Sequence, residues 1–326
     1  MGITIMHYRL LGSRTGLQVS ELALGTGRLG TLPSGGVDRA AARKTIDVFA
    51  EAGGNFIDTS SAYLSGLAEE IVGEFLADAG RDRFVVSSKY GRTALAQPAR
   101  TEVGSHRKAL IAEVEKSLKR LRTDCIDVYF PHFDDGVTPI EEIMRGLDDL
   151  ARAGKILHIG LSNFPAWRIA EAVTLADLRG WTPVAALQLQ YNLLERAIER
   201  EHLPLAKAHG LDLMAWSPLA GGRLTRKNAG TAIEPIVLVL EACAAEIEVA
   251  APSVALAWLR ARNTIPVIGP RSPEQLVANL KGGSVRLDQS QMARLDSATA
   301  LEFGYPYDLL QQQELKRRWS GMEPAS

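Results

Sequence analysis

Residues 105–130 read SHRKALIAEVEKSLKRLRTDCIDVYF and place a helical pattern directly before a strand pattern. In the first part, apolar residues recur three and four positions apart, which is the spacing of one face of an amphipathic α-helix. These apolar residues are Leu110, Ile111, Val114, Leu118 and Leu121. The last five residues are mostly β-branched or aromatic, as is typical of a buried strand. The stretch therefore predicts one helix followed by one strand.

The same unit recurs along the chain. Short runs rich in Val, Ile and Phe alternate with helical patterns, and most links are about 25 to 45 residues long, enough for a strand, a loop and a helix. The eight runs expected to form strands are 22–24, 56–58, 84–88, 126–130, 156–161, 184–190, 211–216 and 264–268. They predict an α/β fold, a single (β/α)8 TIM barrel over residues 1–326. Because alternation alone does not show that a sheet closes, a doubly wound sheet is an alternative.

The composition excludes several classes of protein. Hydrophobic residues make up 46% of the chain and charged residues 23%, as in a soluble globular protein. A formal net charge of −1 gives no electrostatic reason to expect nucleic acid or a membrane as a partner. No apolar run approaches the about 20 residues of a membrane span, and no secretory signal is expected. With only two cysteines, neither a disulfide framework nor a metal site is expected, and the simplest interpretation is a cytoplasmic protein.

The loop at residues 24–30, LGTGRLG, contains the G-x-G-x-x-G pattern of a Rossmann dinucleotide site. That pattern works only where a helix follows the glycines at once, because the helix N-terminus holds the pyrophosphate. Here residues 31–36 include one Pro and two Gly, and the next helix is expected to begin after an N-cap at Asp38. The loop therefore does not predict a Rossmann site.

Polar side chains follow the expected strands at their carboxyl ends. They are Asp58, Tyr63, Lys89, His132, Ser162, Asn163, Gln188 and Ser217. In a barrel, all of these strand ends lie on one face, which is where active sites are built. We therefore expect the polar side chains to gather at one mouth.

Four of these residues are suited to protonating an alkoxide as it forms from a carbonyl. Tyr63 is a weak acid with an ordinary pKa of about 10, and a nearby Lys89 ammonium is expected to lower that pKa. Asp58 would keep Lys89 charged, and His132 would bind the substrate oxygen or relay its proton. The hydride has to come from a nicotinamide cofactor. Taken singly, each residue also has a structural interpretation, such as a rim tyrosine or a core histidine, but their joint occurrence favours catalysis.

Several stretches resemble the aldo-keto reductase superfamily, in the family's order and over nearly the whole chain. They are YRLLGSRTGLQVSELALGTG, AGGNFIDTSSAY, VVSSKYG, SLKRLRTDCIDVYFPHFDD, GKILHIGLSNF, ALQLQYNLLER, AWSPLAGG and IPVIGPRSPEQLVANL. The resemblance implies a barrel whose bottom is closed by an N-terminal β-hairpin. It also implies reversible NADPH-dependent reduction of an aldehyde or ketone, with Tyr63 as the general acid and Asp58, Lys89 and His132 beside it.

The resemblance further implies a cofactor site. Its residues would be Gly25, Thr26, Asp58, Ser162, Asn163, Gln188, Trp216, Ser217, Pro218, Leu219, Gly221, Gly222, Arg223, Gly269, Arg271, Gln275 and Asn279. Residues 162, 163 and 188 would hold the nicotinamide carboxamide, Trp216 would stack on the ring, and residues 217–222 would cover the pyrophosphate. Arg271 would pair with a 2′-phosphate, which favours NADPH over NADH.

Four positions depart from the usual family pattern. Arg223 and Arg226 replace an apolar residue and a glycine, so closure of that loop over the cofactor is expected to differ. Gly27 stands where a bulky residue is common, which implies a wider substrate pocket. Pro131 lacks an N–H, so one ladder hydrogen bond is expected to be missing beside His132.

Other interpretations stay open. The β-subunits of potassium channels resemble this family and keep the four residues, so a cofactor-sensing regulatory protein is the main alternative. A sugar-converting or lyase barrel without a cofactor is a third. The C-terminal tail, with Phe303, Tyr305 and Tyr307, either borders the substrate pocket or packs on the barrel wall. The sequence predicts neither the carbonyl substrate nor the oligomeric state.

Overall fold

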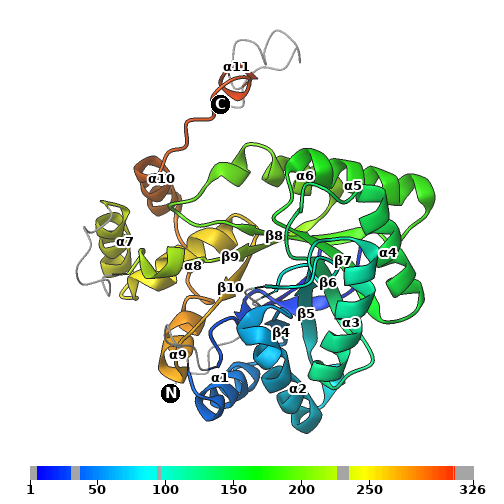
Figure 1. The fold of residues 1–326 in the computed structure, drawn as a ribbon. Helices are drawn as coiled ribbons and strands as arrows, with labels where there is room; N and C mark the ends of the chain where they lie inside the picture. Colours follow the sequence, from blue (N-terminus) through cyan, green and yellow to red (C-terminus); the bar gives the residue numbers. More distant parts are fainter. Residues whose placement is uncertain (1–5, 31–36, 94–96, 226–234, 311, 313–326) are drawn as a thin grey trace.

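The strands of the protein form a closed parallel barrel surrounded by helices (Figure 1). The computed structural model describes residues 6–30, 37–93, 97–225, 235–310 and 312. The barrel strands, in spatial order, are β10 (Ile265–Ile268), β3 (Ala23–Gly25), β4 (Phe56–Asp58), β5 (Val85–Tyr90), β6 (Ile126–Pro131), β7 (Ile156–Ser162), β8 (Val184–Gln190) and β9 (Asp212–Trp216). Because β10 pairs with both β3 and β9, the sheet closes. The predicted (β/α)8 barrel is confirmed, and the doubly wound alternative is wrong.

Helices cover the outside of the barrel (Figure 1). The α-helices of the described residues are α1 (Arg39–Glu51), α2 (Leu67–Ala79), α3 (Arg107–Leu121), α4 (Ile140–Arg152), α5 (Ala166–Arg179), α6 (His202–His209), α7 (Pro235–Glu246), α8 (Ala251–Ala261), α9 (Pro273–Lys281), α10 (Gln289–Ala298) and α11 (Tyr307–Leu310). The short 3₁₀ helices are η1 (Tyr63–Gly66), η2 (Arg81–Arg83), η3 (Ala197–Glu199) and η4 (Ala220–Gly222). At least one α-helix lies between successive barrel strands along the chain, as the sequence pattern predicts.

The stretch at residues 105–130 forms α3 and β6, as predicted. His106 is the N-cap of α3, where its Nδ1 accepts a hydrogen bond from the Ala109 N–H at 3.2 Å. Of the five apolar residues of the predicted face, four are buried, whereas Ile111 is 41% exposed. Ile111 follows Leu110 directly, and one residue turns a helix by about 100°, so its side chain points away from the core.

An antiparallel hairpin closes the amino-terminal end of the barrel. It pairs β1 (Tyr8–Leu10) with β2 (Gln18–Ser20). Arg9 forms an ion pair with Asp212, the first residue of β9, with an N–O distance of 3.0 Å. The Gly12 N–H donates to the other carboxylate oxygen of Asp212 at 3.3 Å. Since Asp212 begins its strand, the hairpin lies at the bottom of the barrel, opposite the strand carboxyl ends, as predicted.

Apolar side chains fill the barrel interior below the carboxyl ends of the strands. Phe56, Val128 and Phe130 belong to this interior cluster and are fully buried. A Cβ at Gly160 would lie 2.0 Å from Cε1 of Phe130, so only glycine leaves room for that ring. Because the interior is packed with apolar side chains, polar groups gather at the mouth, where the strands end.

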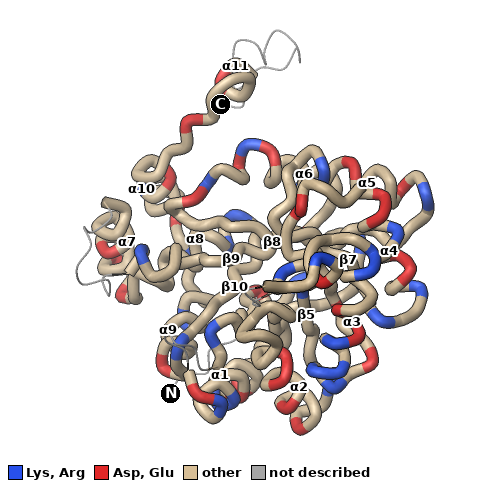
Figure 2. Tube along the Cα trace, in the orientation of Figure 1, with Lys and Arg blue, Asp and Glu red and all other residues tan. Residues whose placement is uncertain are grey.

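Charged residues of both signs are interspersed along the outer helices (Figure 2). This agrees with the formal net charge of −1. Among the described residues, no helix is both long and apolar enough to span a membrane.

The described part of the C-terminal tail ends in α11, which lies apart from the barrel (Figure 1). Tyr305 is 88% exposed. The Tyr307 hydroxyl donates to the carboxylate of Glu201, just before α6. The described part of the tail thus contacts the outer wall of the barrel at Glu201, and no residue of α11 is buried.

Candidate active site

The four predicted catalytic residues come together at the carboxyl ends of β4, β5 and β6. Asp58 is the last residue of β4, Lys89 lies next to the end of β5, and His132 directly follows β6. Tyr63 begins η1, in the loop after β4. Pro131 does not interrupt β6, because it still pairs with Tyr90 and the following N–H, that of His132, donates to the Tyr90 carbonyl at 2.9 Å.

A buried ion pair forms the base of the site. Lys89 Nζ donates to both carboxylate oxygens of Asp58 at 2.8 and 2.7 Å and to the Thr59 carbonyl at 2.9 Å. The Ser87 hydroxyl and Gln188 Nε2 donate to Asp58 Oδ1 at 2.7 and 2.8 Å. Burial opposes the charge of Lys89, but the Asp58 carboxylate and Tyr63 together outweigh burial, and the pKa of Lys89 is raised. Lys89 is therefore a fixed cation at neutral pH.

The Tyr63 hydroxyl lies 3.4 Å from Lys89 Nζ, which is also 5.0 Å from the centre of the Tyr63 ring. Burial raises the pKa of Tyr63, and although Lys89 acts in the opposite direction, the pKa remains above its ordinary value. Lys89 does lower the pKa of Tyr63, as predicted, but its effect is smaller than that of burial. The prediction that the pKa of Tyr63 falls below its ordinary value is therefore wrong. Tyr63 holds its proton at neutral pH, as a general acid must.

His132 completes the group. Its ring meets the Tyr63 ring edge to face, with centroids 5.8 Å apart, and its Nδ1 lies 3.1 Å from the Ser60 hydroxyl oxygen. Burial, together with the cations Lys89 and Arg92, lowers the pKa of His132 to about 3. The imidazole is therefore neutral at pH 7 and can take part in a hydrogen bond without adding charge to the site.

The residues predicted to hold the nicotinamide carboxamide are joined to this group. Asn163 Nδ2 donates to the His132 carbonyl at 2.8 Å and to the Ser162 hydroxyl at 3.0 Å. Trp216 Nε1 donates to Asn163 Oδ1 at 3.0 Å. Gln188 reaches Asp58 through its amide nitrogen. These side chains, from the ends of β7, β8 and β9, form one polar network with the four predicted catalytic residues.

The backbone around the mouth is strained. Positive φ angles between 50° and 56° occur at the non-glycine residues Leu64, Ser65, Asn163, Ser217 and Ala220. Such conformations cost of order 1–3 kcal/mol each and gather at ligand sites, where surrounding structure holds them. All five follow barrel strands, in the loops after β4, β7 and β9. Two of these strained residues, Asn163 and Ser217, are predicted cofactor contacts. A third, Ala220, lies in the loop at 219–222, which contains further predicted contacts.

The loop with the G-x-G-x-x-G pattern lies beside Tyr63. The Thr26 N–H donates to the Asp58 carbonyl at 2.9 Å, and the Leu29 N–H donates to the Thr26 carbonyl at 2.9 Å, which closes a turn. A Cβ at Gly27 would lie 3.6 Å from the Tyr63 ring. The first part of the loop thus contacts the candidate catalytic group, and a side chain at position 27 would begin in contact with the Tyr63 ring.

The predicted phosphate-binding loops follow β9 and β10, which are neighbours in the barrel. After β9, Ser217 Oγ accepts a hydrogen bond from the Gly221 N–H at 3.1 Å. After β10, the exposed Arg271 donates its N–H to Gln275 Oε1 at 2.9 Å, and a Cβ at Gly269 would meet open space. Asn279 lies one helical turn beyond, on α9. The remaining loop residues predicted here are Pro218, Leu219, Gly222 and Arg223, whereas Arg226 lies outside the described residues.

Sequence reasoning missed three groups that hold the site. The Ser60 hydroxyl contacts His132, the Thr59 carbonyl binds Lys89, and the Ser87 hydroxyl binds Asp58. Ser87 was recognisable, because it lies two residues before Lys89 and alternate strand residues share a face. Tyr90, the residue after Lys89, points outward from the barrel, is buried and donates its hydroxyl to the Ser105 carbonyl at 3.1 Å.

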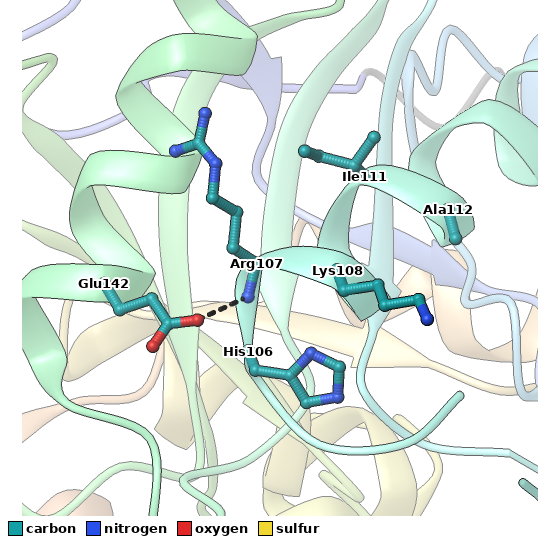
Figure 3. A pocket seen from close by; sticks show the side chains of 6 residues that line it. All are labelled: His106, Arg107, Lys108, Ile111, Ala112 and Glu142. Carbon is teal, nitrogen blue, oxygen red and sulfur yellow. Dashed lines mark hydrogen bonds between the residues drawn. The ribbon is translucent and has the colours of Figure 1, made fainter. Parts of the chain in front are cut away.

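A separate hollow lies on the outer helices rather than at the strand ends (Figure 3). It is lined by His106, Arg107, Lys108, Ile111, Ala112 and Glu142. Inside it, the Arg107 N–H donates to Glu142 Oε1 at 2.9 Å (Figure 3). None of the predicted catalytic or cofactor residues lines this hollow, so the barrel mouth remains the candidate active site.

Comparison with known proteins agrees with this geometry. The sequence model described as the Aldo/keto reductase family matches residues 21–300. The chain belongs to this family. Norsolorinic acid reductase stcV of Emericella nidulans is 35% identical over 93% of this chain and 84% of its own length. Aldo-keto reductase ausK of the same organism is 33% identical over 93% of this chain and 84% of its own length.

A further relative is an aryl-alcohol dehydrogenase (NADP+) of Phanerodontia chrysosporium, 32% identical over 92% of this chain and 88% of its own length. The resemblance inferred from the sequence is therefore confirmed, and the aldo-keto reductase is an NAD(P)H-dependent oxidoreductase. The strained loops after β7 and β9 and the open space at Gly269 fit a nicotinamide cofactor, which supplies the hydride in such reactions.

Proposed function

We propose that this aldo-keto reductase uses NADPH to reduce an aldehyde or ketone to an alcohol, reversibly, with Tyr63 as the general acid. The observation that carries the proposal is the position of the Tyr63 hydroxyl, 3.4 Å from Nζ of the buried Lys89, with the His132 ring edge to face with the Tyr63 ring. Burial raises the pKa of Tyr63 and lowers the pKa of His132 to about 3, which agrees with a proton donor beside a neutral imidazole. When the cofactor is bound, it supplies the hydride to the carbonyl carbon. The protein's own residues supply the proton and hold the oxygen.

The proton moves from the Tyr63 hydroxyl to the substrate oxygen as negative charge develops there. Lys89 stabilises the resulting tyrosinate, because its ammonium is already in place and held by Asp58. His132 orients the carbonyl oxygen through a hydrogen bond that leaves the imidazole neutral. In the reverse direction the tyrosinate accepts the proton from the alcohol.

The preference for NADPH rests on Arg271. Its guanidinium forms no ion pair with the residues that the structure describes, and it precedes α9, which carries the other two predicted adenosine contacts, Gln275 and Asn279. A planar guanidinium binds a phosphate with two parallel hydrogen bonds, which NADH cannot use because it lacks the 2′-phosphate. The name of one relative, an aryl-alcohol dehydrogenase (NADP+), also points to the phosphorylated cofactor.

Oxidation of NADPH, followed at its nicotinamide absorbance, tests the function on the purified full chain. Aromatic aldehydes and ketones belong in the panel because one relative is an aryl-alcohol dehydrogenase and another a norsolorinic acid reductase. We expect turnover of at least one aromatic carbonyl, at a kcat/KM at least about tenfold higher with NADPH than with NADH, which corresponds to about 1.4 kcal/mol of transition-state binding. Tight NADPH binding with no turnover over a broad panel would support the cofactor-sensing alternative instead.

Gly27 is proposed to set the width of the substrate pocket, because a Cβ at this position would lie 3.6 Å from the Tyr63 ring. We expect Gly27→Trp to lower kcat/KM for bulky aromatic carbonyls at least about tenfold, because the indole would narrow the substrate pocket. The kcat/KM for a small aldehyde should not change. Comparison of kcat/KM for benzaldehyde and a polycyclic ketone measures this ratio. Equal activity of the variant and the wild type on the large ketone contradicts the proposal.

A further inference from the structure

A buried carboxylate outside the catalytic group links the elements that carry Tyr63 and Lys89. Glu69 lies in the first turn of α2 and is fully buried. Its Oε1 accepts a hydrogen bond from the Ser88 hydroxyl at 2.5 Å, and its Oε2 accepts one from Arg120 Nε at 2.6 Å. Ser88 is the residue directly before Lys89 on β5. The carboxylate thus joins α2 to β5 at the residue adjacent to Lys89.

The position of Tyr63 depends on where α2 is held. Tyr63 is separated from α2 by only three residues, Leu64, Ser65 and Gly66, with φ angles of 56°, 56° and 94°. Leu64 and Ser65 do not maintain a left-handed conformation by local preference, so it must be imposed by the elements at the two ends of this segment. A displacement of α2 is therefore passed on to the Tyr63 side chain.

Contacts with α3 fix the other side of α2. A Cβ at Gly66 would lie 2.8 Å from Cδ of Arg120, and a Cβ at Gly73 would lie 2.3 Å from the Arg120 carbonyl oxygen, so glycine permits the close approach at both positions. Arg120 also donates to Glu113 at 2.8 Å, within its own helix. Arg120 is therefore already anchored on α3, and its bond to Glu69 adds a link between α3 and α2.

We propose that Glu69 is a positioning residue that sets the separation between the Tyr63 hydroxyl and Lys89 Nζ. The inference rests on the proposed function, because that separation matters only if Tyr63 donates the proton. A carboxylate accepts hydrogen bonds from both the Ser88 hydroxyl and Arg120 Nε, which belong to different elements, and its charge pairs with the Arg120 guanidinium. Glutamine has one acceptor oxygen, which Arg120 needs, and its NH₂ group donates to the Ser88 hydroxyl oxygen. Glu69→Gln therefore replaces the ion pair with Arg120 by a neutral hydrogen bond and weakens the link between α3 and α2.

We expect Glu69→Gln to lower kcat for carbonyl reduction about 10- to 100-fold, as a misplacement of about 1 Å does, while the Kd for NADPH is unchanged. The pH profile supplies a second readout. Lys89 lowers the pKa of Tyr63, so a greater Tyr63–Lys89 separation raises that pKa. The loss of kcat at alkaline pH, where Tyr63 loses its proton, is then displaced to higher pH in the variant.

Glu113→Gln is the matched control. It removes the other carboxylate that binds Arg120, and this contact lies within α3 rather than between α2 and β5. Its kcat and pH profile should equal those of the wild type. Ser88→Ala removes only the link to β5 and should displace the alkaline limb in the same direction, which keeps the test decisive if Glu69→Gln does not fold. The proposal is overturned if Ser88→Ala and Glu69→Gln lose kcat at the same alkaline pH as the wild type. It is also overturned if Glu113→Gln shifts this pH as much as they do. Turnover by the wild type, and its loss in Tyr63→Phe, tests the proposed function separately.

Discussion

Tyr63→Phe should lose about 10²- to 10⁴-fold in kcat for carbonyl reduction, the range that a positioned general acid contributes. The substitution removes only the hydroxyl, whose hydrogen bond is the 3.4 Å contact with Lys89 Nζ. The ring keeps its edge-to-face contact with His132, and the Asp58–Lys89 pair keeps all of its bonds. The fold and the cofactor site should therefore be intact, so the Kd for NADPH should not change.

Steady-state NADPH oxidation measures the loss, and fluorescence titration of NADPH measures binding. Tyr90→Phe is the matched control, since Tyr90 lies one residue beyond Lys89 but points to the outside of the barrel and donates its hydroxyl to Ser105. The control should reduce carbonyls at the rate of the wild type. If Tyr63→Phe reduces carbonyls with the kcat of the wild type, Tyr63 is not the general acid, whatever the control shows.

The sequence was sufficient to predict where the candidate site lies. Strand periodicity identified β4, β5 and β6, and the polar residues that follow them were predicted to meet because parallel strands end on one face of a barrel. The alternation along β5 also follows from the sequence, since Ser87 and Lys89 point inward while Ser88 and Tyr90 point outward. The resemblance to a family then assigned the chemistry, which periodicity alone cannot do.

The electrostatics of the site were not predictable in the same way. The sign of the pKa shift of Tyr63 depends on whether burial or the nearby Lys89 dominates, and burial is a property of the assembled loops. Glu69 was missed for a related reason. On its own helix it is one of two successive glutamates, and its partners Ser88 and Arg120 are 19 and 51 residues away in the chain. No local pattern distinguishes this buried carboxylate from the solvent-exposed Glu70.

Lys89→Met should be destabilising as well as inactivating, because it leaves the Asp58 carboxylate buried without its cation. In the native protein Asp58 is 1% exposed and receives two of its hydrogen bonds from Lys89 Nζ. Removing one partner of a buried ion pair costs about 3–5 kcal/mol. The free energy of unfolding in urea, and kcat for carbonyl reduction, should both fall in this variant.

The double variant Asp58→Asn/Lys89→Met separates the two effects. Replacing both charges leaves no buried ion, and such replacements are often close to neutral for stability. Most of the lost free energy of unfolding should therefore return, since Ser87 and Gln188 can still donate to the asparagine oxygen. Activity should not return, because the tyrosinate formed at Tyr63 would have no adjacent ammonium. If Lys89→Met were as stable as the wild type, the pair would not be held as a buried charge, and if the double variant reduced carbonyls at the native rate, Lys89 would have no part in stabilising the tyrosinate.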